Sequence, residues 1–558
     1  MWRQRAVFGL FSAAFLLIVF RLFYWQIIKG PSLAEAASEQ YYFKLLLPAL
    51  RGEIQSQDGS PIVSNKKAYL VFAEPQKIKD TREFSKKVAE ILKLDAQEIE
   101  DRLRVPNAVW APLKNKVDEI EAAQLKSFQY PGLGFEKEGK RYYPESSMAA
   151  HIVGFVGKDV SGNDAGYFGL EGYYDQALKG KSGLLVQEKD ARGLPIVLGG
   201  SKRIPAEDGQ NLKLYVDRTI QFIADQYLKK GILKYGAKSG IIAIMDPKTG
   251  GLLASATYPT YDPNDYPNAD MEMFANPLVS MTYEPGSTFK TIVMAAALNE
   301  KAVRPQMIFN ESEPVKIGEY LIKTWNDQYH GDMTMTEVLE KSSNPGMVYV
   351  GKLLGRDKLY KYLTQFGFGT KTGIDVQGEE EASIRPIKNW YEIDAATATF
   401  GQGFAVTPIQ MLRAVAALAN QGRLMQPMVV KAFIDPSGKT IDQQPKKISQ
   451  VITTDTASQI KEMMVAAADH GDAKWTKPKG YRIAGKTGTA QVPIAGHYDE
   501  KKTIASFVGF APADDPIFVM LVRLSEPQTS QWGSETAAPL FFSVAKELFT
   551  YYGISPRD

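Results

Sequence analysis

The sequence predicts an α+β protein, in which helices flank an antiparallel sheet that is joined to an elongated mixed module and an apolar N-terminal helix. Two strand pairs predict the sheet. Residues 239–258 show a strand, a turn around Asp246-Pro247 and a second strand, and residues 503–524 repeat this pattern around a turn of Pro and Asp. Because helical patterns fill the interval, we expect the first and last strands to share one sheet.

Composition excludes several classes of protein. The 558 residues are 44% hydrophobic, 11% aromatic and 23% charged, which are globular values rather than those of a disordered or fibrous chain. Lys and Arg total 66 against 63 Asp and Glu, a net charge of +3 that does not favour a nucleic-acid binder. Cysteine is absent and only four histidines occur, so we expect proton transfer to use other side chains, without Cys-ligated metals.

An apolar stretch follows the first five residues. Residues 6–28 contain one charge, Arg21, and as a helix would span about 34 Å, enough to cross a bilayer. Arg3 and Arg5 precede the stretch, so the positive-inside rule places the N-terminus in the cytoplasm and the bulk of the chain outside. The alternative is a cleaved signal peptide, because residues 34–36 have a small-x-small form. Both interpretations export the rest of the chain.

Residues from about 40 to 200 mix short β-like runs with Gly-rich turns and one clear helix. The helical pattern covers residues 81–104, where apolar side chains recur on one face: Val88, Ile91, Leu92, Ile99 and Leu103. No dense group of potential catalytic side chains occurs in this region, which is typical of an accessory module. We expect it to end near residues 205–212.

Residues 284–300 carry the strongest catalytic pattern. Pro285-Gly286 breaks the chain before an almost wholly apolar helix that we expect to begin at Ser287. Unpaired backbone N–H groups at a helix start favour developing negative charge. Lys290 shares a helix face with Ser287, as a lysine base would with a serine nucleophile. The pKa of this lysine would have to fall from about 10.4 towards 7, through burial and a second cation nearby.

The Ser-x-x-Lys spacing alone is weak evidence, because it also occurs at Ser64, Ser458 and Ser543, which we expect to be surface positions. Partners for the serine and lysine are therefore needed. Residues 342–344 (Ser-Ser-Asn) precede Pro345 at a predicted helix start.

Two interpretations of this Ser-Ser-Asn segment remain open. Ser343 or Asn344 could be a helix N-cap and nothing more. Alternatively, Ser342 could pass a proton between Ser287 and a leaving group, while Asn344 could bond both a lysine and a substrate amide.

Lys-Thr-Gly occurs three times and only one copy has a catalytic setting. Residues 248–250 lie in the predicted hairpin turn, and residues 371–373 lie in a loop. Residues 486–488 instead enter a β-like run shortly before the terminal strand pair.

A strand that lines a cleft can offer the Thr489 N–H to an oxyanion and its edge to an extended peptide. Lys486 and the Thr487 hydroxyl suit a substrate carboxylate, and Lys486 supplies the second cation near Lys290.

The ordered set STFK (287–290), SSN (342–344) and KTGTA (486–490) resembles the penicillin-binding proteins and serine β-lactamases, in which three motifs line one cleft. The resemblance extends over most of the chain. The non-catalytic module of class B, monofunctional penicillin-binding proteins is similar to residues 51–54, 141–157 and 169–183, and their transpeptidase domain to residues 400–422.

This resemblance implies a domain plan. A cytoplasmic tail (1–5) would precede a transmembrane helix (6–28), a dimerisation or pedestal module (29–210) and a transpeptidase domain (211–558) with the penicillin-binding and serine β-lactamase-like fold. The catalytic domain of this single-pass protein would lie on the extracytoplasmic face of the cytoplasmic membrane.

The resemblance also implies a D,D-transpeptidase that cross-links peptidoglycan stem peptides with D-Ala-D-Ala ends through a serine acyl-enzyme, without cofactor or metal. β-Lactams would inhibit it by mimicking those ends. The implied catalytic residues are Ser287, Lys290, Ser342, Asn344 and Lys486, and the implied substrate-binding residues are Thr487, Gly488 and Thr489.

Other members of the wider group fit less well. A bifunctional class A protein needs a glycosyltransferase domain before the transpeptidase domain. The sequence after the apolar stretch shows no candidates for the catalytic glutamates of such a domain. A β-lactamase is usually compact, whereas this chain has a large exported module. A β-lactam sensor needs intracellular machinery, and a silent scaffold would be expected to lose a motif.

Within class B, the sequence is more similar to the division-specific FtsI-type branch or its sporulation relatives, and the elongation-specific branch remains the alternative. The implied partners are a membrane glycan polymerase of the FtsW/RodA type and other cell-division proteins, with no nucleic acid.

Overall fold

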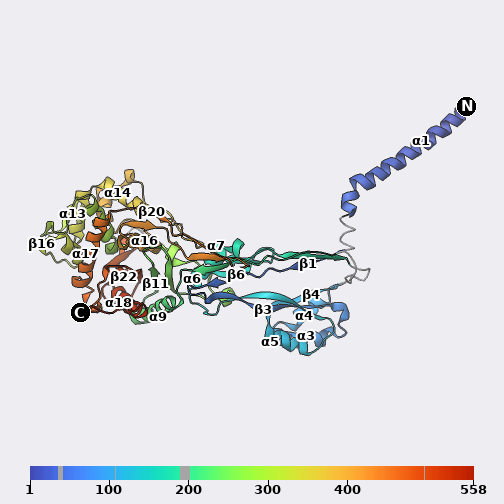
Figure 1. The fold of residues 1–558 in the computed structure, drawn as a ribbon, viewed down its shortest axis with the longest axis horizontal. Coiled ribbons are helices and arrows are strands. Elements are labelled where there is room, and N and C mark those ends of the chain that lie inside the picture. The colour runs from blue at the N-terminus through green and yellow to red at the C-terminus, as the bar shows by residue number, and fades with distance from the viewer. Residues whose placement is uncertain (35–41, 107, 189–200, 495–496, 558) are drawn as a thin grey trace. The chain divides into compact units, whose positions relative to one another are not determined.

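The computed structural model describes residues 1–34, 42–106, 108–188, 201–494 and 497–557. The chain forms two compact units (Figure 1). One unit consists of residues 1–51 and 179–209, and the other consists of residues 52–178 and 210–558.

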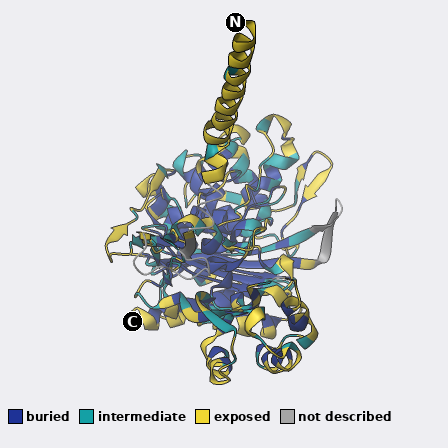
Figure 2. Cartoon of the chain, turned by 90° about the vertical axis from the view of Figure 1, so that its right-hand side faces the viewer, coloured by how far each residue is buried: buried dark blue, intermediate teal, exposed yellow. Residues whose placement is uncertain are grey.

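The smaller unit begins with helix α1 (Trp2–Phe23), which continues as a π-helical turn η1 (Tyr24–Ile28). Figure 2 shows that this helix is exposed along nearly its whole length, although its side chains are mostly apolar. Among the described residues, Trp2–Ile28 is the one helix long and apolar enough to cross a membrane. A helix that is apolar all round and not covered by protein requires an apolar surrounding such as lipid. The predicted apolar helix is therefore present as a single membrane-anchor candidate.

The smaller unit also contains a three-stranded antiparallel sheet. Its strand order is β1-β8-β9, with β1 at Tyr42–Leu47, β8 at Gly183–Glu188 and β9 at Ser201–Ile204.

The larger unit begins with a helix-covered sheet. Strand β3 (Pro61–Ala73) pairs antiparallel with both β4 (Ala111–Asp118) and β5 (Leu133–Tyr142). Helices α3 (Thr81–Leu92), α4 (Ala96–Leu103) and α5 (Glu119–Ser127) contribute apolar side chains to one core with these strands.

The prediction of one helix over residues 81–104 is wrong, because α3 and α4 are separate helices. Lys93 adopts a left-handed backbone conformation (φ 53°) that ends α3. The carboxylate of Asp95 then accepts the Gln97 N–H at 2.7 Å and caps α4. Val88 and Ile99 nevertheless enter the same core. The apolar spacing therefore continued across the break and could not reveal it.

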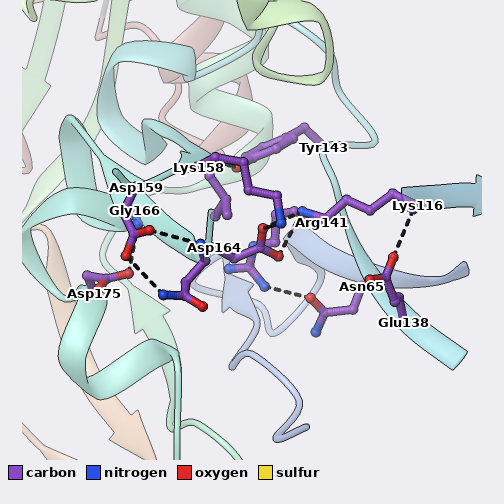
Figure 3. A network of polar contacts seen from close by, with 12 residues as sticks. Asn65, Lys116, Glu138, Arg141, Tyr143, Lys158, Asp159, Asp164, Gly166 and Asp175 are labelled. Carbon is purple, nitrogen blue, oxygen red and sulfur yellow. Dashed lines mark hydrogen bonds and ion pairs between the residues drawn. The ribbon is translucent and has the colours of Figure 1, made fainter. Parts of the chain in front are cut away.

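Polar contacts connect β5 to the short elements that follow it, up to residue 178 (Figure 3). Arg141, in β5, donates from Nε to Glu171 at 2.6 Å and from Nη1 to Asn65 at 3.1 Å. The Arg141 and Glu171 side chains are 5% and 0% exposed, so their ion pair is buried. The elements joined here are β6 (Phe155–Lys158), β7 (Asp164–Tyr167), α7 (Gly169–Tyr173) and α8 (Asp175–Leu178), and helix α6 (Ala150–Val153) precedes β6.

A five-stranded antiparallel sheet forms the centre of the larger unit. Its order is β12-β11-β23-β22-β21. The strand bounds are β11 Ser239–Met245, β12 Leu252–Tyr258, β21 Ala484–Ile494, β22 His497–Ala511 and β23 Phe518–Ser525. Both predicted strand pairs are confirmed, and β11 pairs directly with β23, so the first and last predicted pairs do share one sheet. Strand β21 lies at the edge, where its outer side has no strand partner among the described residues.

Helices cover both faces of this sheet. Alternate residues of β23, such as Val522 and Leu524, enter a core with α9 (Arg218–Tyr235) and α18 (Ala537–Tyr551), which pack against each other (Figure 1). Val519 and Leu521 enter the core that contains α11 (Lys290–Asn299) and α16 (Pro408–Ala419). Side chains on every side of α11 are buried, as expected for a helix that is apolar all round.

A second sheet has the strand order β19-β18-β10-β2-β3-β4, and β5 also pairs with β3. The further strands are β2 Ile54–Gln55, β10 Asn211–Leu214, β13 Ile308–Glu311, β14 Val315–Ile317, β15 Tyr320–Ile322, β16 Gly331–Thr334, β17 Arg423–Met425, β18 Val430–Ile434, β19 Thr440–Asp442 and β20 Lys447–Gln450. The further α-helices are α10 Pro277–Ser280, α12 Met335–Glu340, α13 Asn344–Leu354, α14 Arg356–Gln365, α15 Glu392–Ala398 and α17 Thr454–His470. Short 3₁₀ turns are η2 Pro75–Lys77, η3 Pro263–Asn268, η4 Met271–Met273, η5 Gly286–Phe289, η6 Ile387–Asn389 and η7 Lys474–Thr476.

Candidate active site

The turn η5 and helix α11 position Ser287 and Lys290. The helix expected to begin at Ser287 opens as a 3₁₀ turn, and its α-helical part begins at Lys290. In a 3₁₀ turn residues i and i+3 are aligned, so Ser287 and Lys290 still share a face. Gly286 has φ +56°, and a Cβ at this position would lie 3.1 Å from the Thr489 carbonyl oxygen. A glycine here therefore lets the turn approach strand β21.

Lys290 is fully buried and hydrogen-bonded to the Ser-Ser-Asn segment. Its Nζ donates to the Ser342 carbonyl oxygen at 2.6 Å and to Asn344 Oδ1 at 2.7 Å, and lies 3.3 Å from Ser342 Oγ. Ser342 itself has φ +55°, a conformation that non-glycine residues adopt rarely and at an energetic cost. The structure therefore brings the first two predicted motifs into direct contact.

Burial and charge both reduce the proton affinity of the lysines in this site. Burial lowers the pKa of Lys290 well below its ordinary value of 10.5, the charge of Lys486 lowers it further, and Glu311 opposes both effects. Burial also lowers the pKa of Lys486 to about 8, against an opposing effect of Asp472. The second cation predicted near Lys290 is therefore present.

The third motif lies on the edge strand β21. Lys486 Nζ donates to Thr487 Oγ1 at 3.1 Å. A Cβ at Gly488 would lie 2.5 Å from Ser506 Oγ and 2.8 Å from Thr288 Cγ2, so only glycine allows the strand to lie this close to η5. Thr489 Oγ1 accepts the Gly533 N–H at 3.0 Å.

One cleft collects most of the predicted residues. Its wall includes Ser287, Ser342, Asn344, Thr487 and Thr489, and it encloses about 100 Å³. Lys290 and Lys486 are buried below its surface, and Gly488 contacts η5.

The other copies of these motifs lie in other settings. Lys248-Thr249-Gly250 forms the turn between β11 and β12, and residues 371–373 lie in a loop, both as predicted. Ser458 and Ser543 are exposed as expected, whereas Ser64 is half-buried on β3.

Sequence reasoning missed Glu311, which supports the Ser-Ser-Asn segment. This carboxylate is buried at the end of β13, accepts a hydrogen bond from the Ser343 hydroxyl, and lies 2.8 Å from His330 Nδ1. Ser343 Oγ also accepts the Gly346 N–H at 2.8 Å, so the N-cap interpretation of Ser343 is confirmed. No spacing pattern connects Glu311 to this segment in the sequence.

Three further residues of the cleft wall were also not predicted from the sequence. Trp325 and Trp532 meet edge to face, with their ring centroids 4.8 Å apart, and Asp472 is a carboxylate on the same wall. In the described part of the chain, no group of three or more His, Asp or Glu side chains could hold a metal ion.

Two family models match the chain. The penicillin-binding protein transpeptidase domain matches residues 240–547, and the penicillin-binding protein dimerisation domain matches residues 46–214.

Known proteins are similar over almost the whole chain. The stage V sporulation protein D of Bacillus subtilis is 36% identical over 566 residues, which cover 100% of this chain and 87% of that protein. A peptidoglycan D,D-transpeptidase FtsI homolog of Mesostigma viride is 31% identical over 99% of this chain and 96% of its own length. The crystal structure of penicillin-binding protein 3 of Mycobacterium tuberculosis complexed with aztreonam is 26% identical, with a TM-score of 0.71, over 92% of this chain and 98% of that one.

The chain therefore belongs to the penicillin-binding proteins, and its pairing of a dimerisation module with a transpeptidase domain is that of class B. It is a serine-type peptidoglycan D,D-transpeptidase, and its penicillin-binding domain binds β-lactams and peptidoglycan stem peptides. The fold class predicted from the sequence is confirmed.

Proposed function

We propose that Ser287 forms the acyl-enzyme and that Lys290 is its general base. The observation that carries this proposal is the buried Lys290 Nζ, which is hydrogen-bonded to Ser342 and Asn344 with Lys486 nearby. A lysine in this environment loses its proton far more readily than one in water, so it can accept the proton of a serine hydroxyl.

In this proposal Lys290 acts as the neutral amine. The Ser342 carbonyl oxygen and Asn344 Oδ1 are both acceptors, and together they use the two N–H groups of a neutral amine. Its lone pair is then left for a hydroxyl proton. Lys290 takes that proton from Ser287 as the Ser287 oxygen attacks the carbonyl of the penultimate D-alanine.

Ser342 passes the proton onward. Its Oγ lies 3.3 Å from Lys290 Nζ and faces the same cleft as Ser287. Protonation of the departing D-alanine amine through Ser342 completes acylation. Asn344 holds Lys290 in place and positions the peptide through its side-chain amide.

The edge strand β21 binds the substrate. Lys486, with the hydroxyls of Thr487 and Thr489, holds the terminal carboxylate, and Gly488 lets the strand lie against η5. The backbone N–H groups of Ser287 and Thr489 stabilise the oxyanion. The amine of a second stem peptide then attacks the acyl-enzyme, whereas a β-lactam leaves a slowly released adduct.

A cross-linking assay tests this assignment. The full chain in detergent, supplied with glycan strands that carry pentapeptide stems, should release D-alanine and form cross-linked muropeptides, detected by mass spectrometry. Ser287→Ala should form none and should not be labelled by fluorescent penicillin. The matched control is Ser458→Ala, which alters an exposed serine in another Ser-x-x-Lys sequence and should behave as wild type. Continued labelling of Ser287→Ala would remove Ser287 from its role.

The proposed domain plan is a tail at residues 1–5, a membrane span at 6–28, a pedestal at 29–210 and a transpeptidase domain at 211–558. The N-terminus lies in the cytoplasm and the catalytic domain outside. Because the chain has no cysteine, one introduced cysteine reports its own side of the membrane. In intact spheroplasts a membrane-impermeant maleimide should label Ser458→Cys but not Gln4→Cys. The reverse pattern would contradict this topology.

We place the enzyme in the division and sporulation branch, at the septum, beside a membrane glycan polymerase of the FtsW/RodA type. The relatives support this placement, because one is named for stage V of sporulation and another is named as an FtsI homolog. A fluorescently tagged copy should gather at the division or sporulation septum. An even distribution along the side wall would instead favour the elongation branch.

A further inference from the structure

A second cavity lies on the same face of the central sheet as the Ser287 turn. Arg523 and Ser525 alternate along β23 with Val522 and Leu524, which enter the core on the opposite face. Across the strands, Arg523 is opposite Ser506, and Ser506 is opposite Gly488 of the Lys-Thr-Gly motif. We call this space the Arg523 cavity.

The segments that flank the catalytic serine also form the wall of the Arg523 cavity. Tyr283 and Glu284 precede the Pro285-Gly286 break, and their partner loop contributes residues 403–405. The cavity has a volume of about 570 Å³, a size that suits a small ligand. Tyr283 and Val406 exchange backbone hydrogen bonds of 3.0 and 2.9 Å, which hold the two segments together.

Three buried polar atoms of this wall lack hydrogen-bond partners within the described part of the chain. They are Tyr283 Oη, Arg523 Nε and Ser525 Oγ. The three residues are 3%, 3% and 8% exposed, so each is more than nine-tenths buried. Buried polar groups are normally paired, and three such atoms in the residues of one cavity wall therefore point to a missing partner.

The charge of Arg523 is also unbalanced. No carboxylate among the described residues forms an ion pair with it, and its guanidinium carbon lies 5.0 Å from the centroid of the Tyr283 ring. Glu526 lies 3.7 Å from Lys238 and 4.0 Å from Lys502, and Glu284 accepts the Gly403 N–H at 3.0 Å. Burial lowers the pKa of Arg523 to about 10, which still leaves it a cation at neutral pH.

We propose that the Arg523 cavity is a binding site for a carboxylate, held by Arg523, Ser525 and Tyr283. The Tyr283 ring faces the guanidinium, which leaves the in-plane N–H groups for a planar acceptor with two oxygens. Five apolar side chains line part of the cavity, beside Lys238, Thr282 and the two carboxylates described above, so the ligand carries a short apolar body next to its carboxylate. Those apolar residues are Met281, Phe404, Ala405, Val492 and Ile504. The carboxylate belongs either to a free amphipathic acid or to a peptidoglycan stem peptide.

The binding experiment must exclude binding in the cleft that contains Ser287, because that cleft is also expected to bind carboxylates. The full chain in detergent is first acylated with penicillin, and Ser287→Ala is used in parallel without penicillin. Calorimetry then measures binding of hexanoate, of hexanamide as its uncharged analogue, and of an uncross-linked tetrapeptide muropeptide. Saturable binding of hexanoate without binding of hexanamide is expected. Binding of the muropeptide more tightly than hexanoate identifies the stem peptide as the source, and the reverse identifies a free acid.

Variants of the wall give the decisive comparison. Ser525→Ala and Tyr283→Phe each remove one hydroxyl and should weaken carboxylate binding about tenfold. Arg523→Met should weaken it at least about a hundredfold, with its melting temperature measured to establish that it folds. The matched control is Ser255→Ala, which removes a buried, unpartnered hydroxyl from β12 of the same sheet and should leave binding unchanged.

The proposal is overturned if neither carboxylate binds saturably to the acylated chain. It is also overturned if Ser525→Ala and Tyr283→Phe bind as tightly as wild type. Because both variants keep the buried arginine, their result stands even if Arg523→Met fails to fold. Failure of Ser287 as the nucleophile would be seen separately, as continued penicillin labelling of Ser287→Ala.

Discussion

Two buried cations in the larger unit have different surroundings. Arg141 of the accessory region lies 2.6 Å from the buried carboxylate of Glu171 and also bonds Asn65. Lys290 of the cleft is bonded to a backbone carbonyl, an amide oxygen and a hydroxyl, all uncharged. A second cation, Lys486, lowers the pKa of Lys290 further.

The comparison teaches that burial of a cation does not by itself indicate catalysis. A buried cation with a hydrogen-bonded counter-ion joins structural elements, as Arg141 joins β5 to α7 through Glu171. Lys290 has no hydrogen-bonded counter-ion, and burial together with the nearby charge of Lys486 lowers its pKa well below 10.5. The lowered pKa of Lys290 and its contact with Ser342 Oγ therefore distinguish the proposed base from the structural cation Arg141.

The largest expected effect comes from removing the proposed base, Lys290. Lys290→Ala should reduce the rate of acylation by fluorescent penicillin by about 10³-fold or more, because general-base catalysis and the support of Ser342 are both lost. Its melting temperature should stay close to that of wild type, since an unfavourably buried amine is removed. Acylation at the normal rate would exclude Lys290 as the base.

Breaking the Arg141–Glu171 ion pair should have the opposite effect: it should lower stability and leave acylation unchanged. Glu171→Gln leaves Arg141 buried without its counter-ion and should destabilise the larger unit by about 3–5 kcal/mol, while penicillin acylation at low temperature is unchanged. The control is Glu98→Gln, which breaks an exposed pair with Arg102 and should change stability by less than about 1 kcal/mol. Thermal unfolding compares the two variants. Equal losses of stability in the two variants would show that the buried ion pair contributes no more to stability than the exposed one.

A smaller effect is expected at Ser343, which both caps α13 and donates to Glu311. Ser343→Ala should lower stability by about 1–2 kcal/mol and slow acylation several-fold, because its neighbours Ser342 and Asn344 lose their fixed positions. Asp80→Ala removes the N-cap of α3 and should lower stability without changing acylation. If Ser343→Ala is acylated at the wild-type rate, Ser343 only caps α13 and does not help to position Ser342 and Asn344.

Much of the fold followed from local patterns. Both strand pairs around Pro-containing turns were predicted, and so was their union in one sheet, because alternating apolar runs and turn residues are encoded locally. The break between α3 and α4 was missed, since Lys93 adopts a left-handed conformation that periodicity does not reveal. The three motifs were found by their order and setting, and the structure brings Ser287, Lys290 and Ser342 together.

Residues without a spacing pattern were not predictable. Glu311 reaches Ser343 only through the folding of β13 against α13, a separation of 32 positions in the chain. Trp325 and Trp532 meet across the cleft from segments more than 200 positions apart. Arg523, which forms no ion pair with a described carboxylate, lies in a strand that is otherwise a buried, mostly apolar run, and one charge in such a run gives no indication of its neighbours.

The pH profile of penicillin acylation tests the central claim most directly. In the proposed mechanism acylation needs neutral Lys290 and charged Lys486, so the rate should fall on the acid side at a pKa well below 10.5 and on the alkaline side near pH 8. In Lys486→Met the loss of a positive charge should raise the pKa of Lys290, which moves the acid limb to higher pH and removes the alkaline limb. An acid limb at 10.5, or one that Lys486→Met does not move, would contradict the account.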